Sequence, residues 1–126
     1  MNKIALFPGS FDPFTIGHES VVKRALPLFD KIIVAVGYNS EKSGFFSLEQ
    51  RLDWIREIFK YELKIEVQSY EGLTAAFCKK VGSRYLLRGL RTAADFEYER
   101  AIAQMNNMLD HEIETVFLLT KPEHSP

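Results

Sequence analysis

A histidine just after a glycine-bearing turn is the residue of this sequence best suited to chemistry. The apolar stretch 3–7 predicts a buried strand, which Pro8-Gly9 is expected to end. Asp12-Pro13 disfavours a helix in the residues around it, and apolar residues recur at helical intervals from Gly17 onward. His18 is therefore expected in the first turn of a helix, where unpaired backbone N–H groups favour an anion such as phosphate.

A second charged group lies far downstream. Arg88 and Arg91 flank a short Gly-Leu segment after another apolar stretch, and guanidinium groups bind phosphates well. Asp95 and Glu99 are spaced as neighbours on one face of a helix. The alternative is that the arginines only form a solvated ion network with these carboxylates, which is the usual fate of surface charge.

Strand-like and helical stretches alternate along the whole chain. The strands are expected at 3–7, 31–36, 64–69, 84–87 and 115–119, and the helices near 17–29, 48–59, 73–81 and 93–109. Ser47 with Gln50, and Thr92 with Asp95, have the spacing of helix caps. This alternation predicts an α/β class: one Rossmann-like, doubly wound domain, with a five-stranded parallel sheet covered by helices on both faces.

Length and composition narrow the class of protein. The 126 residues, 46% of them hydrophobic, are enough for one domain with a core. A net charge of −1, from 16 basic and 17 acidic residues, favours neither nucleic acid nor a membrane as a partner. The single cysteine, Cys78, excludes an internal disulfide and is expected to be a core residue. Because we find no membrane-spanning run or signal peptide, we expect a cytoplasmic protein.

Two motifs carry a resemblance to a known family. Thr15-Ile16-Gly17-His18 resembles the signature of the nucleotidyltransferases named for a histidine-x-glycine-histidine motif, in the variant that begins with threonine. The segment 87–99, LRGLRTAADFEYE, resembles the arginine-glycine-leucine-arginine segment of the phosphopantetheine adenylyltransferase family. Lys42 and Gly72-Leu73-Thr74 also stand at positions that this family uses, and the resemblance extends from the first strand to Leu119.

The resemblance implies the strand order 3-2-1-4-5 and, with it, the place of the site. In that order strands 1 and 4 are neighbours, and the loops after them diverge at the topological switch point, where ligands bind. The first loop carries Ser10 and His18, and the second is expected to carry Arg88, Gly89 and Arg91. We therefore expect one cleft to contain both motifs.

The family transfers an adenylyl group from ATP to 4′-phosphopantetheine, which gives dephospho-coenzyme A and pyrophosphate. By resemblance, His18 stabilises charge around the α-phosphorus in the transition state. The resemblance further implies one set of residues for the acceptor and one for ATP. The acceptor set is Ser10, Lys42, Thr74 and Arg88; the ATP set is Ser10, Phe11, Gly17, His18, Gly89, Leu90, Arg91 and Glu99.

The family implies further ligands and partners. Mg²⁺ is expected to bind through the ATP phosphates and water, with no predicted protein ligand. Relatives are typically homohexamers, and coenzyme A is a further expected ligand. A serine-rich segment that contacts the ATP phosphates in relatives would begin after Pro126, so we expect residues 1–126 to be a C-terminally incomplete adenylyltransferase domain.

Two other functions stay open. A related nucleotidyltransferase with another phosphate acceptor, such as nicotinate mononucleotide or glycerol phosphate, would share residues 15–18 but would not need Lys42 or the segment 88–91 in this form. The second open function is that of a shortened, non-catalytic module that binds nucleotide or coenzyme A. A dehydrogenase is disfavoured because no GxGxxG follows the first strand. A phospho-receiver domain is disfavoured because Ser69 and Tyr70 stand where it needs a carboxylate.

Helix faces give two expectations about packing. The inward face of the second helix is expected to contain Trp54, Ile55 and Ile58. The apolar residues of the segment 105–109, MNNML, are either core or a subunit contact. Sequence spacing does not decide between these two.

Overall fold

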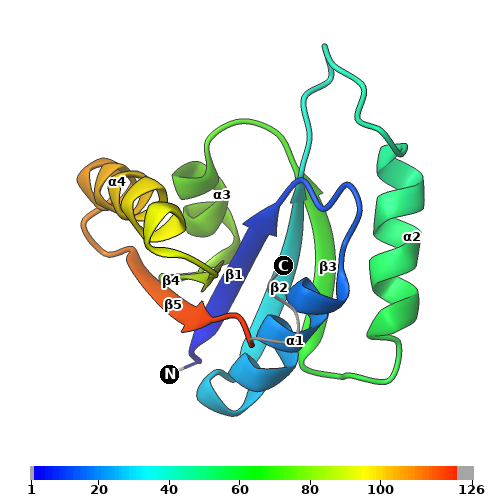
Figure 1. Cartoon of the computed structure of the whole chain (residues 1–126), viewed down its shortest axis with the longest axis horizontal. Coiled ribbons are helices and arrows are strands. Elements are labelled where there is room, and N and C mark those ends of the chain that lie inside the picture. The colour runs from blue at the N-terminus through cyan, green and yellow to red at the C-terminus, as the bar shows by residue number, and fades with distance from the viewer. Residues whose placement is uncertain (1, 122–126) are drawn as a thin grey trace.

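In the computed structural model, which describes residues 2–121, five strands form one parallel sheet (Figure 1). They are β1 (Ile4–Gly9), β2 (Lys31–Gly37), β3 (Ile65–Tyr70), β4 (Tyr85–Leu90) and β5 (Glu114–Leu119). The strand order is β3-β2-β1-β4-β5, and every neighbouring pair is parallel. The predicted fold class and strand order are confirmed. The residues 122–126 that lead toward the expected serine-rich segment lie outside the described residues.

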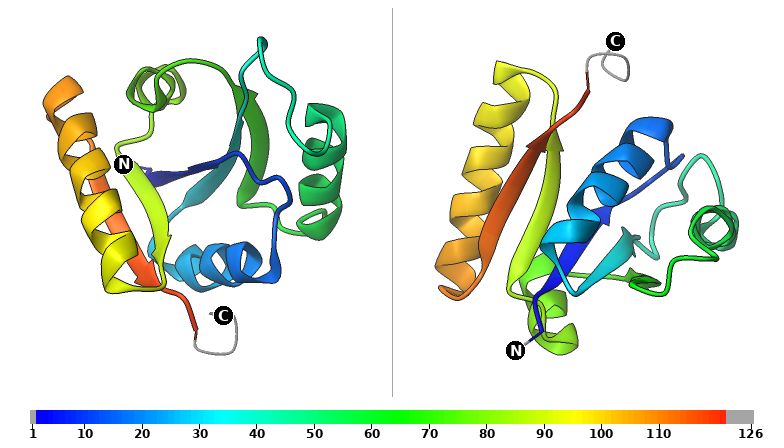
Figure 2. Two further views of the ribbon diagram at one scale, coloured as in Figure 1. Left: turned by 45° about the horizontal axis from the view of Figure 1, so that its top comes forward. Right: turned by 90° about the horizontal axis from the view of Figure 1, so that it is seen from below.

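Helices cover both faces of the sheet (Figure 2). They are α1 (Ile16–Ala25), α2 (Leu48–Ile58), α3 (Thr74–Val81) and α4 (Ala93–Leu109), with a short 3₁₀ helix η1 (Leu26–Leu28) after α1. Alternate residues of β1 point to opposite faces. Ala5 and Phe7 belong to the core beneath α1 and α2, whereas Leu6 belongs to the core beneath α3.

Helix ends follow from local chemistry. The Ser47 hydroxyl accepts the N–H of Gln50 at the start of α2, and the Thr92 hydroxyl accepts the N–H of Asp95 at the start of α4, as the capping patterns predicted. The first helix is shorter than predicted. Its α-helical part ends at Ala25 because Pro27 has no N–H for the next intrahelical bond, and the chain tightens into η1.

The predicted inward face of α2 is partly wrong. Leu52 and Ile55 are buried against the sheet, but Trp54 is 41% exposed and Ile58 is 38% exposed. The face that packs on the sheet is centred between Leu52 and Ile55, so a residue one position before Ile55 is rotated to the edge of the helix. Trp54 packs there against Phe46, with ring centroids 4.8 Å apart.

Two other side-chain expectations can be compared with the structure. Cys78 is fully buried, and burial raises the pKa of its thiol to about 11, which fits a core residue rather than a nucleophile. Met105, Met108 and Leu109 are exposed on α4, so they are not core residues. Their role as a subunit contact stays a prediction.

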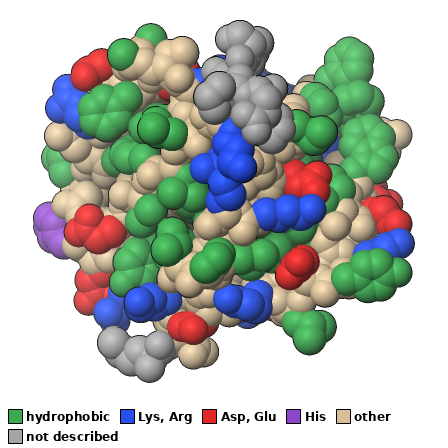
Figure 3. Space-filling view, turned by 60° about the horizontal axis from the view of Figure 1, so that its bottom comes forward, with side chains coloured by type: hydrophobic (Ala, Val, Ile, Leu, Met, Phe, Trp, Pro, Cys, Tyr) green, Lys and Arg blue, Asp and Glu red, His purple; other side chains and the backbone are tan. Residues whose placement is uncertain are grey.

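The surface carries both signs of charge. Lys and Arg side chains are interspersed with Asp and Glu on the face shown in Figure 3, in keeping with the net charge of −1. A mixed surface of this kind gives no extended field of one sign, so anion binding depends on local clusters. Among residues 2–121, no helix has both the length and the apolar character needed to cross a membrane.

Candidate active site

The sheet splits between β1 and β4. These strands pair at only two positions, Ala5 with Tyr85 and Leu6 with Leu86. Beyond them β1 continues along β2, and β4 continues along β5. The gap lies at the carboxyl ends of β1 and β4, where the strand order reverses: β2 and β3 follow on one side of β1, and β4 and β5 on the other. It is therefore the topological switch point.

Both strands extend into the split further than predicted. Pro8-Gly9 continues β1, and Arg88, Gly89 and Leu90 belong to β4 rather than to the loop after it. Each strand keeps one partner, since residues 8–9 pair with β2 and residues 88–90 pair with β5. On the side of β1 that faces the split, the described residues offer no strand to accept a backbone N–H, and Pro8 has none. The Pro8 carbonyl oxygen accepts a hydrogen bond from Nη1 of Arg88. The arginine thereby bridges the separated strands.

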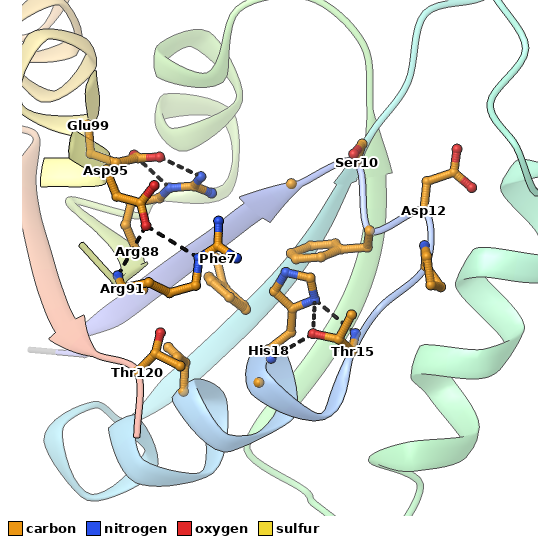
Figure 4. Close-up of a pocket in the computed structure, with 16 residues that line it drawn as sticks. Phe7, Ser10, Asp12, Thr15, His18, Arg88, Arg91, Asp95, Glu99 and Thr120 are labelled. Carbon is orange, nitrogen blue, oxygen red and sulfur yellow. Dashed lines mark hydrogen bonds and ion pairs between the residues drawn. The ribbon is translucent and has the colours of Figure 1, made fainter. Parts of the chain in front are cut away.

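A cavity of about 500 Å³ opens at this split (Figure 4). His18 and Thr15 lie on the side of α1, and Arg88, Arg91 and Glu99 lie on the side of β4 and α4. The complete lining is Phe7, Gly9, Ser10, Phe11, Asp12, Pro13, Thr15, Gly17, His18, Val21, Arg88, Gly89, Arg91, Asp95, Glu99 and Thr120. One cleft therefore contains both motifs found in the sequence.

The His18 imidazole is fixed by a reciprocal cap at the start of α1. The N–H of His18 donates to Oγ1 of Thr15 at 3.3 Å, and the N–H of Thr15 donates to Nδ1 of His18 at 2.9 Å. Because Nδ1 accepts this bond, the proton of the neutral ring belongs on Nε2. The cap therefore leaves an N–H donor on the other side of the imidazole.

An apolar environment keeps this ring neutral. The ring centroids of Phe7, Phe11 and Phe14 lie 6.2, 5.0 and 5.2 Å from that of His18. Burial, with a further contribution from the charges of Arg88 and Arg91, lowers the pKa of His18 to about 4. At neutral pH the imidazole acts as a hydrogen-bond donor and not as a cation.

Side chains pack closely against a glycine on each wall of the cavity. A Cβ at Gly9 would lie 2.8 Å from ring atoms of Phe11, which is buried with a left-handed backbone at φ 47°. A Cβ at Gly89 would lie 3.1 Å from Cγ2 of Val21 on α1. The two glycines allow Phe11 and α1 to approach the strand ends closely.

The arginines are paired with the carboxylates of α4. Arg88 forms a bidentate ion pair with Glu99, with Nε–Oε1 and Nη2–Oε2 both at 3.0 Å. Its side chain is 31% exposed and that of Glu99 is 11% exposed. Arg91 pairs with Asp95 at 3.3 Å in a more exposed position. The ion network considered from the sequence is thus present, but it lines the cavity instead of an open surface.

Two smaller hollows adjoin the cavity and contain the remaining predicted residues. Lys42 lines one of about 350 Å³, which shares Ser10 and Asp12 with the cavity. Thr74 lines one of about 180 Å³, which shares Arg88 and Glu99 with it. Of the predicted site residues, only Leu90 lines none of these three spaces. The Leu90 side chain is buried, and its carbonyl accepts the N–H of Thr120 at 2.7 Å.

Sequence reasoning missed several lining residues. Asp12, Thr15 and Thr120 line the cavity, and Tyr70 lines both smaller hollows. The Tyr70 hydroxyl lies 2.9 Å from the Thr74 hydroxyl and orients it. The sequence did contain a signal for Thr15, because it stands three residues before His18, and this spacing is typical of a capping box at the start of a helix. Thr120 and Tyr70 are placed only by the sheet.

Comparisons with known proteins agree with the motifs. A family model described as cytidylyltransferase-like matches residues 6–126. A phosphopantetheine adenylyltransferase of Flavobacterium psychrophilum is 58% identical over 116 residues, which cover 92% of this chain and 76% of the relative. A second one, of Leptospira biflexa, is 50% identical over 125 residues, which cover 99% of this chain and 78% of the relative.

Solved structures support the fold. A bifunctional NMN adenylyltransferase/ADP ribose pyrophosphatase from Francisella tularensis, solved with AMP and a manganese ion, matches with a TM-score of 0.70. The match covers 99% of this chain and 39% of that one at 16% identity, so it bears on the fold alone. Sequence identity, the two motifs and the split sheet together lead to one conclusion: the chain belongs to the phosphopantetheine adenylyltransferases, within the cytidylyltransferase-like family.

Proposed function

We propose that this protein transfers the adenylyl group of ATP to the phosphate of 4′-phosphopantetheine, which gives dephospho-coenzyme A and pyrophosphate. The observation that supports the proposal is the cleft at the β1–β4 split, where His18 faces Arg88 and Arg91. The chain is also 58% and 50% identical to the two phosphopantetheine adenylyltransferases described above. The family identity favours this acceptor over the phosphate acceptors of more distant nucleotidyltransferases.

The reaction is a direct displacement at the α-phosphorus of ATP. A phosphate oxygen of the acceptor forms the new P–O bond, and the bond from the α-phosphorus to the oxygen bridging toward the β-phosphate breaks. Pyrophosphate leaves with that electron pair. Such transfers are accelerated mainly by in-line positioning and by stabilising charge on the phosphate oxygens. No covalent intermediate on the protein is needed.

His18 is the proposed transition-state donor. Its Nε2–H is held by the cap with Thr15, so it is oriented before substrate binds. Negative charge on the oxygens of the α-phosphate is redistributed as the leaving oxygen departs, and a donor fixed in a partly apolar site stabilises it. A ring with a pKa of about 4 remains a neutral donor across the physiological range.

The remaining residues divide between the two substrates. Lys42, Arg88 and Thr74, with Ser10, are the proposed acceptor residues, since they line the cavity and its two adjoining hollows. The ATP side comprises Ser10, Phe11, Gly17, His18, Gly89, Leu90, Arg91 and Glu99. Leu90 has a buried side chain and lines none of the three spaces, so its place on the ATP side depends on the family resemblance. Glu99 also fixes the Arg88 guanidinium, since each of its oxygens accepts one bond from it.

Mg²⁺ enters this proposal as the partner of the ATP phosphates. Among the described residues, no group of three or more His, Cys, Asp and Glu side chains is arranged to hold a metal ion. The oxygens of Asp12 accept backbone N–H groups and those of Glu99 accept from Arg88. This donor set fits an ion bound by substrate oxygens and water.

We further propose a cytoplasmic homohexamer, in which the exposed apolar residues of α4, Met105 and Met108, contribute to a subunit contact.

The test is an acceptor comparison. The protein is incubated with MgATP and 4′-phosphopantetheine, nicotinate mononucleotide or glycerol phosphate, and pyrophosphate release is measured with identification of the product by mass spectrometry. We expect dephospho-coenzyme A to form and the other two acceptors to give little product. A faster reaction with either of them would favour a related nucleotidyltransferase. Binding of ATP and 4′-phosphopantetheine without turnover would favour the non-catalytic module.

A further inference from the structure

Lys42 lies on a loop that the sheet alone does not hold in place. Residues 38–47 connect β2 to α2 and project beyond the end of the sheet (Figure 1). Within the loop, the N–H of Lys42 bonds to the carbonyl of Asn39 at 3.0 Å. A lysine on a projecting loop can contribute to phosphate binding only if the loop has a defined position, because its ordering otherwise opposes binding.

Asp12 holds one end of this loop. Its Oδ2 accepts the N–H of Phe45 at 2.6 Å, and its Oδ1 accepts the N–H of Phe46 at 2.7 Å. The bonds from Phe46 and Phe45 keep the pKa of Asp12 below its usual value. Both carboxylate oxygens of a residue in the β1–α1 loop are thus used to bind the backbone of the Lys42 loop.

Glu71 holds the other end. Its Oε2 accepts the N–H of Ser40 at 2.6 Å, and this bond lowers the pKa of the carboxyl group. Glu71 lies directly before Gly72, which has φ +92°, and close to Thr74 at the start of α3. The loop that carries Lys42 is therefore tied to the loops after β1 and β3 on its two sides.

The fit around Asp12 is close. A Cβ at Gly44 would lie 2.4 Å from Oδ2 of Asp12, so a side chain there would displace the carboxylate. Arg51 of α2, only 6% exposed, donates to the carbonyl of Ser10 at 2.9 Å. The hydrogen bonds of Asp12 and Glu71 to the backbone of the loop 38–47 are called the clamp below. The Arg51 contact fixes the segment that carries Asp12 against α2 and thereby supports the clamp.

We propose that Asp12 and Glu71 are positioning residues, which hold the loop 38–47 so that Lys42 stays directed at the acceptor phosphate. The proposal rests on the proposed function, in which Lys42 binds that phosphate. Coulomb's law alone gives the opposite expectation, because removal of a negative charge beside an anion site should strengthen phosphate binding. The direction of the effect therefore separates positioning from simple electrostatics.

Binding measurements use the full chain and 4′-phosphopantetheine, with ATP as the second ligand. Asp12→Ala, Glu71→Ala and Gly44→Ala should each weaken 4′-phosphopantetheine by about tenfold while changing ATP affinity by less than about threefold. Gly44→Ala changes no charge, so its effect cannot be electrostatic. Asp12→Asn keeps one acceptor oxygen and should be intermediate. Glu41→Ala, an exposed carboxylate on the same loop, is the charge-matched control and should not weaken binding.

Amide proton NMR tests the clamp without substrate. A hydrogen bond to a carboxylate moves an amide proton downfield, so Asp12→Ala should move those of Phe45 and Phe46 upfield, and Glu71→Ala should move that of Ser40. Unmoved resonances, or unchanged or tighter 4′-phosphopantetheine binding in the three clamp variants, would overturn the proposal. Lys42→Ala is the reference. If it weakens 4′-phosphopantetheine and the clamp variants do not, only the positioning role fails; if it has no effect, the role of Lys42 in the proposed function fails as well.

Discussion

Removal of the Glu99 carboxylate is expected to destabilise the protein through the arginine that it leaves behind. Glu99 of α4 makes two bonds of 3.0 Å to Arg88 of β4, and Arg88 in turn bonds across the split to the carbonyl of Pro8 on β1. In a Glu99→Ala variant the Arg88 guanidinium keeps its bond to the carbonyl of Pro8 but loses its charge partner. A partly buried cation without a partner carries a desolvation penalty.

The burial of the Arg88–Glu99 pair determines how much stability Glu99→Ala is expected to lose. Loss of one partner costs about 3–5 kcal/mol in fully buried pairs and about 0–1 kcal/mol in exposed ones. The Arg88 and Glu99 side chains are 31% and 11% exposed, so a value between these limits, about 2 kcal/mol, is expected. For a chain of 126 residues this corresponds to a fall in Tm of about 7 °C. Glu99→Gln keeps one acceptor oxygen and should lose about half as much.

Thermal unfolding followed by circular dichroism measures this difference. The matched control is Glu97→Ala on the same helix, because Glu97 pairs with Arg100 at 3.0 Å where both side chains are at least half exposed. That variant should lower Tm by less than about 2 °C. Equal losses in the two variants would refute the reasoning, since the effect would then come from α4 itself and not from the buried guanidinium.

Three further predictions concern the substrates, the histidine and the close helix approach. Lys42→Ala and Arg88→Ala should weaken 4′-phosphopantetheine by more than about tenfold and ATP much less, as measured by calorimetry, whereas equal losses would place these side chains in the wrong half of the cleft. The His18 ring should titrate near pH 4 by NMR. Between pH 4 and pH 6.5 the unfolded chain binds a proton on this ring and the folded chain does not, so the free energy of unfolding should rise with pH over this range. His18→Asn should reduce that rise. A His18 titration near pH 6.5 would contradict the burial argument. Gly89→Ala, with its Cβ 3.1 Å from Cγ2 of Val21, should lower Tm by about 4 °C. An unchanged Tm would show that the Val21 side chain shifts to make room for the added methyl group.

Much of the fold could be predicted because its signals are local. Strand-like runs, the Ser47 and Thr92 caps and the change to helical spacing after Gly17 are each carried by a few neighbouring residues. The strand order could not be derived in this way. It came from the family resemblance, and it then brought the His18 and Arg88 segments to one cleft.

The details that could not be predicted depend on contacts between distant segments. The bonds from Asp12 to the loop of Lys42 join residues 33 and 34 positions apart, and no pattern within either segment indicates them. Arg88 was expected in a loop, but pairing with β5 extends the strand through it. Trp54 was expected on the inward face of α2 with Ile55 and Ile58, but the rotation of α2 on the sheet leaves Trp54 at the edge of that face.

The measurement that tests the central claim most directly is the single-turnover rate of adenylyl transfer in a His18→Ala variant, with ATP affinity determined by calorimetry on the same sample. His111→Ala, which changes an exposed histidine beyond the end of α4, is the control. If the Nε2–H of His18 stabilises the transition state, the rate should fall on the order of 10²-fold or more, while ATP affinity changes by less than about threefold and the control keeps its rate. An unchanged rate at saturating substrates, or a loss explained wholly by weaker ATP binding, would contradict that role.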